Sequence, residues 1–308
     1  MGKRGRSLTN QLQHCVRESF APGQSKHAAK GQQDDSRHDG RTYSYASRSA
    51  KLDLAKNFGN WMREEHPEIK RAVDIRSEHA NQFLIQRAAE GCTQATLEAY
   101  SSNLRSISKE IANAFGRGRL DWDEINTPKA YNNAVRTVPM SLEDRDTLAA
   151  SFDRGSNGGR AVTISRAAGL RSEEIADLLR RDIAPDGSTV YVREGKGGRS
   201  RTVPVLDEGA RLELVRIRQN TPDGAKVVPI QSESINKVLR SHMAKLGMGE
   251  KYKDTTLHAL RKTWAQERYD RYRADGKSIA DTMAMVNREL GHSDSRVGLL
   301  ERYVQNIH

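Results

Sequence analysis

The chain has 308 residues, and its 51 lysines and arginines exceed its 40 acidic residues, which gives a net charge of +11. At about 150 residues per domain this length predicts two domains, and the basic excess favours a polyanionic partner, either nucleic acid or an anionic membrane surface. Only 36% of the residues are hydrophobic, and the sequence has no apolar run of the about 18 residues that a spanning helix needs, which excludes an integral membrane protein.

The N-terminal sequence and the cysteines exclude further classes. The stretch MGKRGRSLTNQLQHCVRESF has neither the apolar core nor the small-residue cleavage site of a secretory signal. Cys15 and Cys92 lie far apart and belong to no CxxC or Cys/His group. We therefore expect a protein that stays inside the cell, with reduced thiols rather than a disulfide framework or a structural zinc site.

The basic excess does not locate a binding site, because it is spread along the chain. Residues 1–41 hold 8 basic and 4 acidic residues, residues 42–136 hold 14 and 12, and residues 137–308 hold 29 and 24.

The first part of the chain predicts a tail, a helical bundle and a linker. Residues 21–41 contain almost no large apolar side chains and cannot offset the entropy of ordering, so residues 1–41 are expected to form a flexible basic tail. Apolar residues then recur at helical spacing, which predicts a helical domain over residues 42–120. Residues 121–140 contain Pro128 and Pro139 among polar residues, a composition typical of a linker.

A second domain is predicted over residues 141–308. Ser141 opens a stretch with the character of a helix start, and helices are expected at 158–168, at 172–180 and from about 207 onward. Two β-branched runs, 188–194 and 201–205, are joined by a glycine-rich basic turn and predict a hairpin. The fold class is therefore mainly α with a small β-sheet, that is, α+β.

Five local patterns in this second domain could carry chemistry, and each has an ordinary explanation as well. Arg171 follows a glycine at a predicted helix start, and Glu174 lies on the same helical face, able to orient the guanidinium. Such an i,i+3 pair is also a common surface ion pair.

The turn of the predicted hairpin gathers positive charge. Lys196 lies at its tip, where it could reach a phosphate and supply a proton, although an exposed turn lysine is the simpler interpretation. Arg193, Arg199 and Arg201 flank it and are candidates for contacting nucleic acid, together with Lys262 further along the chain.

The other three patterns combine histidine, arginine and tyrosine. His258 and Arg261 form an i,i+3 pair that presents an imidazole and a guanidinium to one point, although such a pair also arises by chance. His292 follows a glycine at a predicted helix end, where it could equally cap carbonyls or pack. Tyr303, near the chain end, is by default a buried core tyrosine, since a phenol is a poor nucleophile unless cations stabilise the phenolate.

Metal and nucleotide motifs are lacking in the sequence. It contains no HExxH motif, no paired aspartates of a two-metal nuclease and no GxxxxGK[ST] loop. We therefore expect no metal and no cofactor, so that any phosphoryl transfer would depend on side-chain cations.

Taken in order, Gly-Leu-Arg-x-x-Glu, a lysine hairpin, His-x-x-Arg, Leu-Gly-His and a near-terminal tyrosine resemble the tyrosine recombinase, or phage integrase, family. The resemblance covers residues of about 140–308. The stretch from Thr96 to Arg105 is similar to part of that family's core-binding domain, a less specific match.

The resemblance implies a two-domain clamp around duplex DNA and a set of residue roles. Tyr303 would attack a scissile phosphate, forming a 3′-phosphotyrosine and releasing a 5′-hydroxyl. Arg171 and Arg261 would stabilise the transition state, and Lys196 would protonate the leaving oxygen. His258 would help to deprotonate Tyr303, and His292 would hydrogen-bond the phosphate.

The resemblance further implies a site-specific recombinase of a bacterial phage or mobile element, working as a homotetramer on DNA in the bacterial cytoplasm, in some cases with accessory DNA-bending proteins and without a membrane. The alternatives are a type IB topoisomerase-like nicking and resealing enzyme and a DNA-binding protein that no longer cuts.

Three spacings depart from the family pattern. The interval of 31 residues from Arg261 to His292 predicts an inserted helix or loop, and the 11 residues from His292 to Tyr303 predict a different path for the tyrosine. Five residues follow Tyr303, too few for a full helix, so subunit contacts are expected elsewhere.

Overall fold

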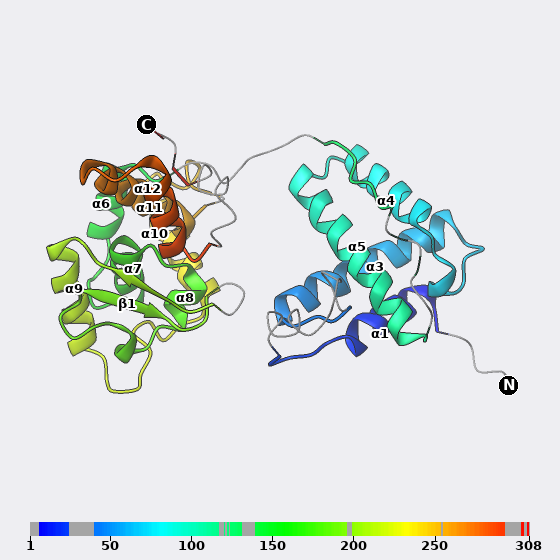
Figure 1. Cartoon of the computed structure of the whole chain (residues 1–308), viewed down its shortest axis with the longest axis horizontal. Coiled ribbons are helices and arrows are strands. Elements are labelled where there is room, and N and C mark those ends of the chain that lie inside the picture. The colour runs from blue at the N-terminus through cyan, green and yellow to red at the C-terminus, as the bar shows by residue number, and fades with distance from the viewer. Residues whose placement is uncertain are drawn as a thin grey trace. The chain divides into compact units, whose positions relative to one another are not determined.

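The computed structural model describes residues 6–24, 40–116, 120, 122, 124–130, 139–195, 199–253, 255–292, 303, 304 and 307. The chain forms two compact units, Met1–Asn133 and Ala134–His308 (Figure 1). Each has its own hydrophobic core.

Within the described residues, the regular elements of the first unit are helices, apart from an isolated bridge between Phe20 and Thr42. Its elements are α1 (Leu8–Glu18), α3 (Tyr45–Glu65), the 3-10 turn η1 (Ala72–Asp74), α4 (Ser77–Ala89) and α5 (Gln94–Ala114). Helix α1 packs on α3 and α5, and α4 packs on α5. The side chains at the centre are aromatic: the ring of Phe58 lies 5.2 Å from that of Phe83 and 6.1 Å from that of Trp122.

The prediction of a flexible tail over residues 1–41 was wrong for the part that forms α1. Leu12, Cys15 and Val16 are completely buried, because the apolar positions of α1 share one helical face that fills the gap between α3 and α5. The prediction extended the polar composition of residues 21–41 to the residues before them and so overlooked the short amphipathic helix α1. Residues 25–39, the most polar part of the predicted tail, lie outside the described residues.

A buried polar cluster holds the chain segment around Thr42 in the first unit. Thr42 forms a parallel bridge with Phe20, and its hydroxyl accepts a hydrogen bond from Lys51 Nζ at 2.7 Å. Lys51 also donates to Ser106 Oγ at 2.6 Å and pairs with Glu110. A lysine and a glutamate buried together tie α3, α5 and Thr42 to one another, because neither charge is tolerated alone away from water.

The predicted linker also belongs in part to the first unit. Trp122 is 1% exposed and its indole donates to the carbonyl of Ile75 at 2.8 Å, and Ile125 is buried beside it. The N-terminal core therefore extends past the predicted boundary at residue 120. Burial removes the apolar surface of these side chains from water and so stabilises the unit, whereas exposure in a linker would not.

The second unit combines helices with one hairpin. Its elements are α6 (Leu142–Ala150), α7 (Asn157–Ala168), α8 (Ser172–Ala176), η2 (Arg180–Asp182), β1 (Thr189–Val192), β2 (Arg201–Pro204), α9 (Glu208–Gln219), α10 (Ser232–Lys245), α11 (Leu257–Ala274) and α12 (Ile279–Glu289). The predicted helix at 172–180 is shorter than expected, since it ends at Ala176 and gives way to η2.

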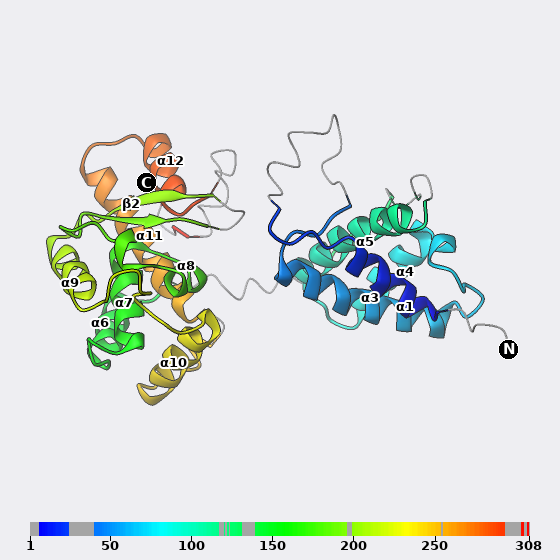
Figure 2. The same cartoon turned by 90° about the horizontal axis from the view of Figure 1, so that it is seen from below.

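The hairpin is antiparallel and forms as predicted. Thr189 lies opposite Pro204 and Val192 opposite Arg201. Val190, Val192 and Val203 face the core, and Figure 2 shows the two strands across one side of α7 and α11. The fold is therefore mainly α with a small sheet.

The long interval between Arg261 and His292 consists of the rest of α11, a turn and α12. The path from His292 to Tyr303 lies outside the described residues.

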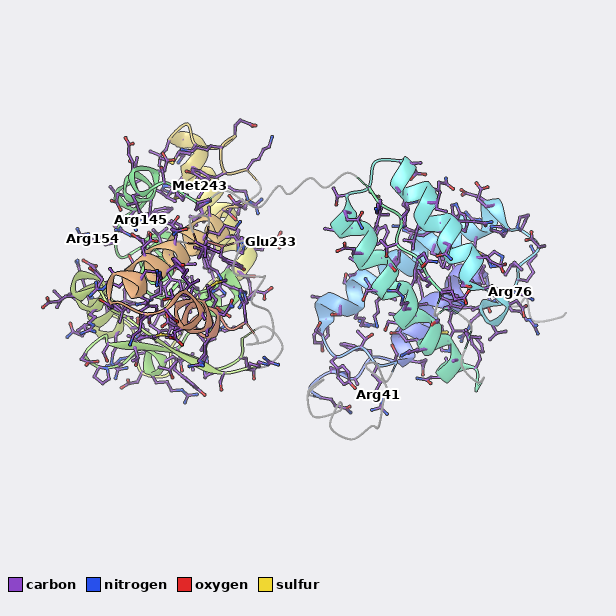
Figure 3. The ribbon with its side chains drawn as sticks, turned by 45° about the horizontal axis from the view of Figure 1, so that its top comes forward. Arg41, Arg76, Arg145, Arg154, Glu233 and Met243 are labelled. Carbon is purple, nitrogen blue, oxygen red and sulfur yellow. The ribbon has the colours of Figure 1, made fainter. Side chains whose placement is uncertain are left out.

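No helix within the described ranges is long and apolar enough to cross a membrane. Figure 3 shows exposed arginines such as Arg41 and Arg76 at separate places on the first unit, in line with the scattered charge.

We predict that Leu12→Ala destabilises the first unit by about 2–5 kcal/mol, because it opens a cavity between α1 and the bundle. The measurement is urea unfolding followed by tryptophan fluorescence. Ile85→Ala on α4 is the matched control, since Ile85 is 60% exposed and its truncation should cost less than about 0.5 kcal/mol. Equal effects of the two substitutions would contradict the placement of α1 in the core.

Candidate active site

A single buried carboxylate, that of Glu174, holds the arginines of the site together. Its side chain is 3% exposed and accepts a hydrogen bond from Arg171 Nη1 at 2.9 Å. Arg201 donates to both of its oxygens, at 2.9 and 2.8 Å, and Arg261 Nη1 lies 3.8 Å from Oε2. Three guanidinium groups therefore surround one carboxylate and leave an excess of positive charge suited to an anion.

The local sequence explains how Arg171 and Glu174 meet. Gly169 ends α7 in the left-handed conformation, with φ of 58°, and a Cβ there would lie 2.4 Å from the Trp264 ring. Arg171 is the N-cap of α8, and its backbone N–H donates to Glu174 Oε2 at 2.9 Å. The predicted orientation of the arginine by the glutamate is present, stabilised by this reciprocal cap.

Arg261 is fixed by backbone carbonyls at two sides. It is 1% exposed, and it donates to the carbonyls of Gly169 and Leu290, the second at 2.6 Å. Burial, and then the charge of Arg171, lower the pKa of Arg261 to about 10. The guanidinium stays charged at neutral pH, so it supplies a fixed positive charge inside the protein.

The pKa of Glu174 shows that its arginines outweigh its burial. Burial alone raises the pKa of a carboxyl group, but hydrogen bonding and charge from Arg201, the charge of Arg261 and the Arg171 backbone N–H lower it to about 2. Glu174 is thus ionised at neutral pH.

Tyr303 lies among the other candidate residues. Its ring centroid is 5.3 Å from that of His258 and 5.1 Å from that of His292, and Arg261 Cζ lies 5.8 Å from it. The tyrosine is 8% exposed. It is therefore buried, as its default interpretation predicts, but it is buried between two imidazoles and a guanidinium.

His258 is presented by a strained helix start. Thr256, the N-cap of α11, has φ of 37°, which is unfavourable for a β-branched residue. Its hydroxyl donates to Asn236 Oδ1 at 2.9 Å, and Asn236 Nδ2 donates to Ser172 Oγ at 3.2 Å. Asn236 on α10 thus joins the start of α8, next to Arg171, to the start of α11.

His292 is oriented from the end of α12. Its Nδ1 lies 3.2 Å from Asn287 Oδ1, and its backbone N–H donates to the Asn287 carbonyl at 2.9 Å. Gly291 has φ of 69°, and a Cβ there would lie 2.8 Å from Arg201 Nη1. The Leu-Gly-His pattern therefore lets the chain pass close to Arg201 and turn the imidazole toward Tyr303.

The structure brings five of the six candidate catalytic residues together: Arg171, His258, Arg261, His292 and Tyr303. Lys196 lies outside the described residues. The ends of its turn meet, since the backbone N–H of Gly195 donates to the Arg199 carbonyl at 2.8 Å.

Two of the residues predicted to contact nucleic acid have other positions. Arg201 is not available to a ligand from outside, because its 7% exposed side chain is occupied by Glu174 and by the Glu289 carbonyl at 2.7 Å. Lys262 is 2% exposed, its Nζ lies 6.0 Å from the Tyr303 ring, and burial lowers its pKa to about 8. Arg193 pairs with Asp182 at 3.0 Å, and Arg199 is exposed.

Sequence reasoning missed the structural partners Arg201, Asn236 and Asn287. The only available signal was alternation along β2, which places Arg201 on the same face as the buried Val203. For the two asparagines no local pattern exists, since their partners come from other helices or from a helix end.

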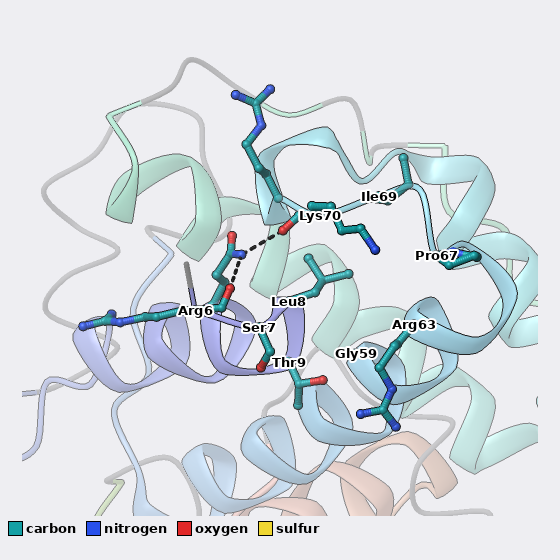
Figure 4. A pocket seen from close by; sticks show the side chains of 11 residues that line it. Arg6, Ser7, Leu8, Thr9, Gly59, Arg63, Pro67, Ile69 and Lys70 are labelled. Carbon is teal, nitrogen blue, oxygen red and sulfur yellow. Dashed lines mark hydrogen bonds between the residues drawn. The ribbon is translucent and has the colours of Figure 1, made fainter. Parts of the chain in front are cut away.

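A separate basic cavity of about 450 Å³ lies in the first unit, between α1, α3 and the segment before η1 (Figure 4). Arg6, Arg63, Lys70 and Arg71 line it, and no acidic residue does. Arg71 is partly neutralised by Asp74, whose carboxylate lies 2.6 Å away. Within the described part of the chain, no cluster of histidine, cysteine or carboxylate side chains could hold a metal ion.

Comparison with known proteins places these observations in context. Residues 157–305 match the model of the phage integrase family. The tyrosine recombinase XerC of Nitrobacter winogradskyi is 28% identical over 211 residues, which cover 63% of this chain and 63% of that protein. XerC of Mesorhizobium japonicum is 27% identical over 217 residues, covering 65% and 67%. The chain thus spans less than two thirds of the length of the Nitrobacter protein.

Solved structures share the fold. The Tn1549 transposon integrase in complex with transposon right end DNA has a TM-score of 0.60 at 14% identity, with 97% of this chain and 94% of that chain covered. A lambda integrase dimer bound to a COC′ core site also has a TM-score of 0.60 at 14% identity, with 96% and 77% covered.

We predict that Glu174→Gln destabilises the second unit at pH 7 by about 3 kcal/mol, because a carboxylate whose pKa falls from 4.5 to about 2 on folding contributes about that much. The unfolded chain binds a proton between these pH values and the folded chain does not. The difference between wild type and variant should therefore be full at pH 7 and 5 and shrink as the pH falls below about 4.5.

Urea unfolding over this pH range measures the effect, with Glu173→Gln, an exposed neighbour, as the control. A loss that is the same for both variants, or that does not change with pH, would contradict the role of Glu174 as the counter-charge of the arginines.

Proposed function

We propose that the chain, whose residues 157–305 match the model of the phage integrase family and which is similar to XerC tyrosine recombinases, is a site-specific DNA recombinase. In this proposal it cuts and rejoins DNA strands through a covalent 3′-phosphotyrosine on Tyr303. No metal, cofactor or nucleotide takes part.

One observation carries the proposal: a tyrosine far along the chain lies between His258, His292 and Arg261. Arg261 is in turn joined to Arg171 through Glu174. A phenol becomes a nucleophile only where a base removes its proton and cations stabilise the negative charge. Both requirements are present around Tyr303.

We assign roles from the chemistry of the side chains and, for the described residues, from their positions; the role of Lys196 is the one that the family resemblance implies. Arg171 and Arg261 bind the nonbridging oxygens of the scissile phosphate and stabilise the pentavalent transition state. His258 takes the proton of Tyr303, His292 donates a hydrogen bond to the phosphate, and Lys196 protonates the leaving 5′-oxygen. The phosphotyrosine keeps the energy of the broken bond, so a 5′-hydroxyl of another strand reverses the step without a cofactor.

The proposed partner is duplex DNA. Structures that share the fold include a lambda integrase dimer bound to a core site and a lambda integrase tetramer bound to a Holliday junction, which supports a homotetramer on DNA. The XerC relatives are bacterial, so we place the reaction in the bacterial cytoplasm, on the DNA of a phage or other mobile element.

The type IB topoisomerase alternative shares this chemistry but does not exchange partners. The XerC relatives and the integrase folds do not favour it. Exchange of strands between two duplexes, as opposed to relaxation of a supercoiled plasmid alone, separates the two activities.

We predict that Tyr303→Phe abolishes covalent trapping of the protein on a nicked suicide substrate carrying its attachment site, while DNA binding is unchanged. Removal of the phenol oxygen leaves no atom to form the phosphodiester with the protein. A denaturing gel measures the adduct. Tyr191→Phe is the control, because Tyr191 is 42% exposed on β1.

An adduct of unchanged amount in Tyr303→Phe would remove this residue as the nucleophile. Binding without any adduct in wild type, on a substrate shown to contain the site, would favour the DNA-binding protein that no longer cuts.

We further predict that the basic cavity of the first unit contacts the DNA backbone. Replacing Arg63 and Lys70 together by glutamine should weaken binding and lower the slope of log K against log salt by about 0.9 for each lost phosphate contact, hence by about 1.8. Fluorescence anisotropy between low and moderate salt measures this slope. Lys56→Gln controls for nonspecific loss of charge, because Lys56 is an exposed residue of α3 outside the cavity. If the slope changes by the same amount per replaced residue in the control and in the double variant, the proposed contact is refuted.

A further inference from the structure

A second buried charge cluster lies behind the site and is used by none of the roles above. It consists of Arg268 and Tyr272 on α11 and Glu289 at the end of α12, which are 5%, 6% and 8% exposed. A buried arginine and a buried glutamate cost desolvation energy, and an apolar trio of similar volume would stabilise the fold at least as well. The contacts of the cluster show what these charges achieve instead.

Arg268 joins three elements with one side chain. Its Nε lies 2.9 Å from Glu289 Oε2 on α12, and its Nη2 donates to the carbonyl of Pro204 at the end of β2. Its guanidinium also stacks over Trp264, with Cζ 4.8 Å from the ring centroid. The planar fork of an arginine can serve these partners at once, whereas a lysine presents a single point of charge.

Glu289 connects Arg268 to the arginines of the site. Its side chain is held by Arg268 and by the hydroxyl of Tyr272, while its backbone carbonyl accepts from Arg201 at 2.7 Å. The next carbonyl, that of Leu290, accepts from Arg261 at 2.6 Å. Two arginines of the Glu174 cluster are thus fixed by consecutive carbonyls, and His292 follows two residues later.

Trp264 provides a second route to the same groups. Its ring, covered by Arg268, packs against Gly169 so closely that a Cβ there would lie 2.4 Å away, and its indole donates to the Ala167 carbonyl at 3.2 Å. The carbonyl of Gly169 accepts from Arg261. Both routes from Arg268 therefore end at Arg261.

We propose that Arg268 is a positioning residue for the cleavage reaction, acting through Glu289 to set the carbonyls that hold Arg201 and Arg261 and the end of α12 that carries His292. This inference rests on the proposed function. It assigns no contact with DNA to Arg268; the residue acts by fixing Arg261 and His292, to which the proposed function gives contacts with the scissile phosphate. A displacement of about 1 Å at reacting groups can cost about 100-fold in rate.

The test compares Arg268→Gln and Arg268→Lys with Arg145→Gln in the full-length protein. Arg145 is a matched control because it is largely buried and pairs with Glu267 of the same helix α11 at 2.5 Å, yet it links α11 to α6 and not to the site (Figure 3). The measurements are the single-turnover rate of adduct formation at saturating suicide substrate, the DNA Kd and the midpoint of thermal unfolding.

For Arg268→Gln we expect a 10- to 100-fold slower adduct formation with Kd within twofold of wild type. Arg268→Lys should recover part of the rate, because it keeps the charge beside Glu289 but cannot also reach the Pro204 carbonyl. Arg145→Gln should leave the rate within twofold. A merely structural role of Arg268 would lower the midpoint and the active fraction but not the rate at saturation, and that result would overturn the proposal.

A readout that needs no catalysis separates failure of this inference from failure of the proposed function. Amide hydrogen exchange should speed up over residues 286–292 in Arg268→Gln and not in Arg145→Gln, since the backbone N–H groups of Leu290, Gly291 and His292 close the end of α12. If wild type forms no adduct, the proposed function fails. If exchange at 286–292 is the same in both variants, the positioning fails, whatever the activity.

Discussion

The second unit is organised by the need to balance three guanidinium groups with one carboxylate. Glu174 is almost fully buried, and Arg171, Arg201 and Arg261 approach it from three parts of the chain. Removing the carboxylate would leave these guanidinium groups without their shared counter-charge, which costs several kcal/mol when the charges are buried. Three positive charges against one negative charge leave a positive excess in the cluster. Carbonyl oxygens of Gly169, Glu289 and Leu290 share in this balance, so the backbone itself is shaped around the arginines.

This constraint explains why short, unremarkable segments occupy the positions they do. Helix α8 has only five residues, too few to be stable alone, and it exists because its cap is the Arg171–Glu174 pair. Strand β2 begins with Arg201, so the hairpin is tied to Glu174 and to the end of α12. Gly169 and Gly291 supply the two left-handed turns that let the backbone approach Trp264 and Arg201 without a side chain in the way. The small sheet thus serves to carry an arginine to the cluster.

The sequence allowed the local parts of this arrangement to be predicted, and not the parts that depend on distant partners. Arg171 and Glu174 are three residues apart on one helix start, and the hairpin follows from two β-branched runs, so both could be predicted. Arg201 was grouped with the surface cations, because its partners lie 27 and 88 residues away and nothing near it in the sequence indicates a buried carboxylate. Helix α1 was missed for a different reason: its apolar face needs α3 and α5 to be buried against, and a polar stretch follows it directly. Helix propensity averaged over a window of residues does not distinguish such a helix from the polar segment next to it.

The chemical types of the cations and imidazoles divide the work of the site. Arg261 keeps its charge at neutral pH even though burial and Arg171 lower its pKa to about 10, so an arginine there can stabilise negative charge but cannot exchange a proton. Burial lowers the pKa of Lys262 to about 8, so the charge of this lysine depends more on pH near neutrality than that of a guanidinium does. In the proposed reaction, proton transfer requires side chains that can both bind and release a proton, and the two imidazoles at 5.3 and 5.1 Å from the Tyr303 ring are the candidates. A tyrosine nucleophile, the role that we propose for Tyr303, requires both fixed positive charge and a group that exchanges protons. Glu174 supports the first requirement, because it holds the guanidinium groups of Arg171 and Arg261 in place.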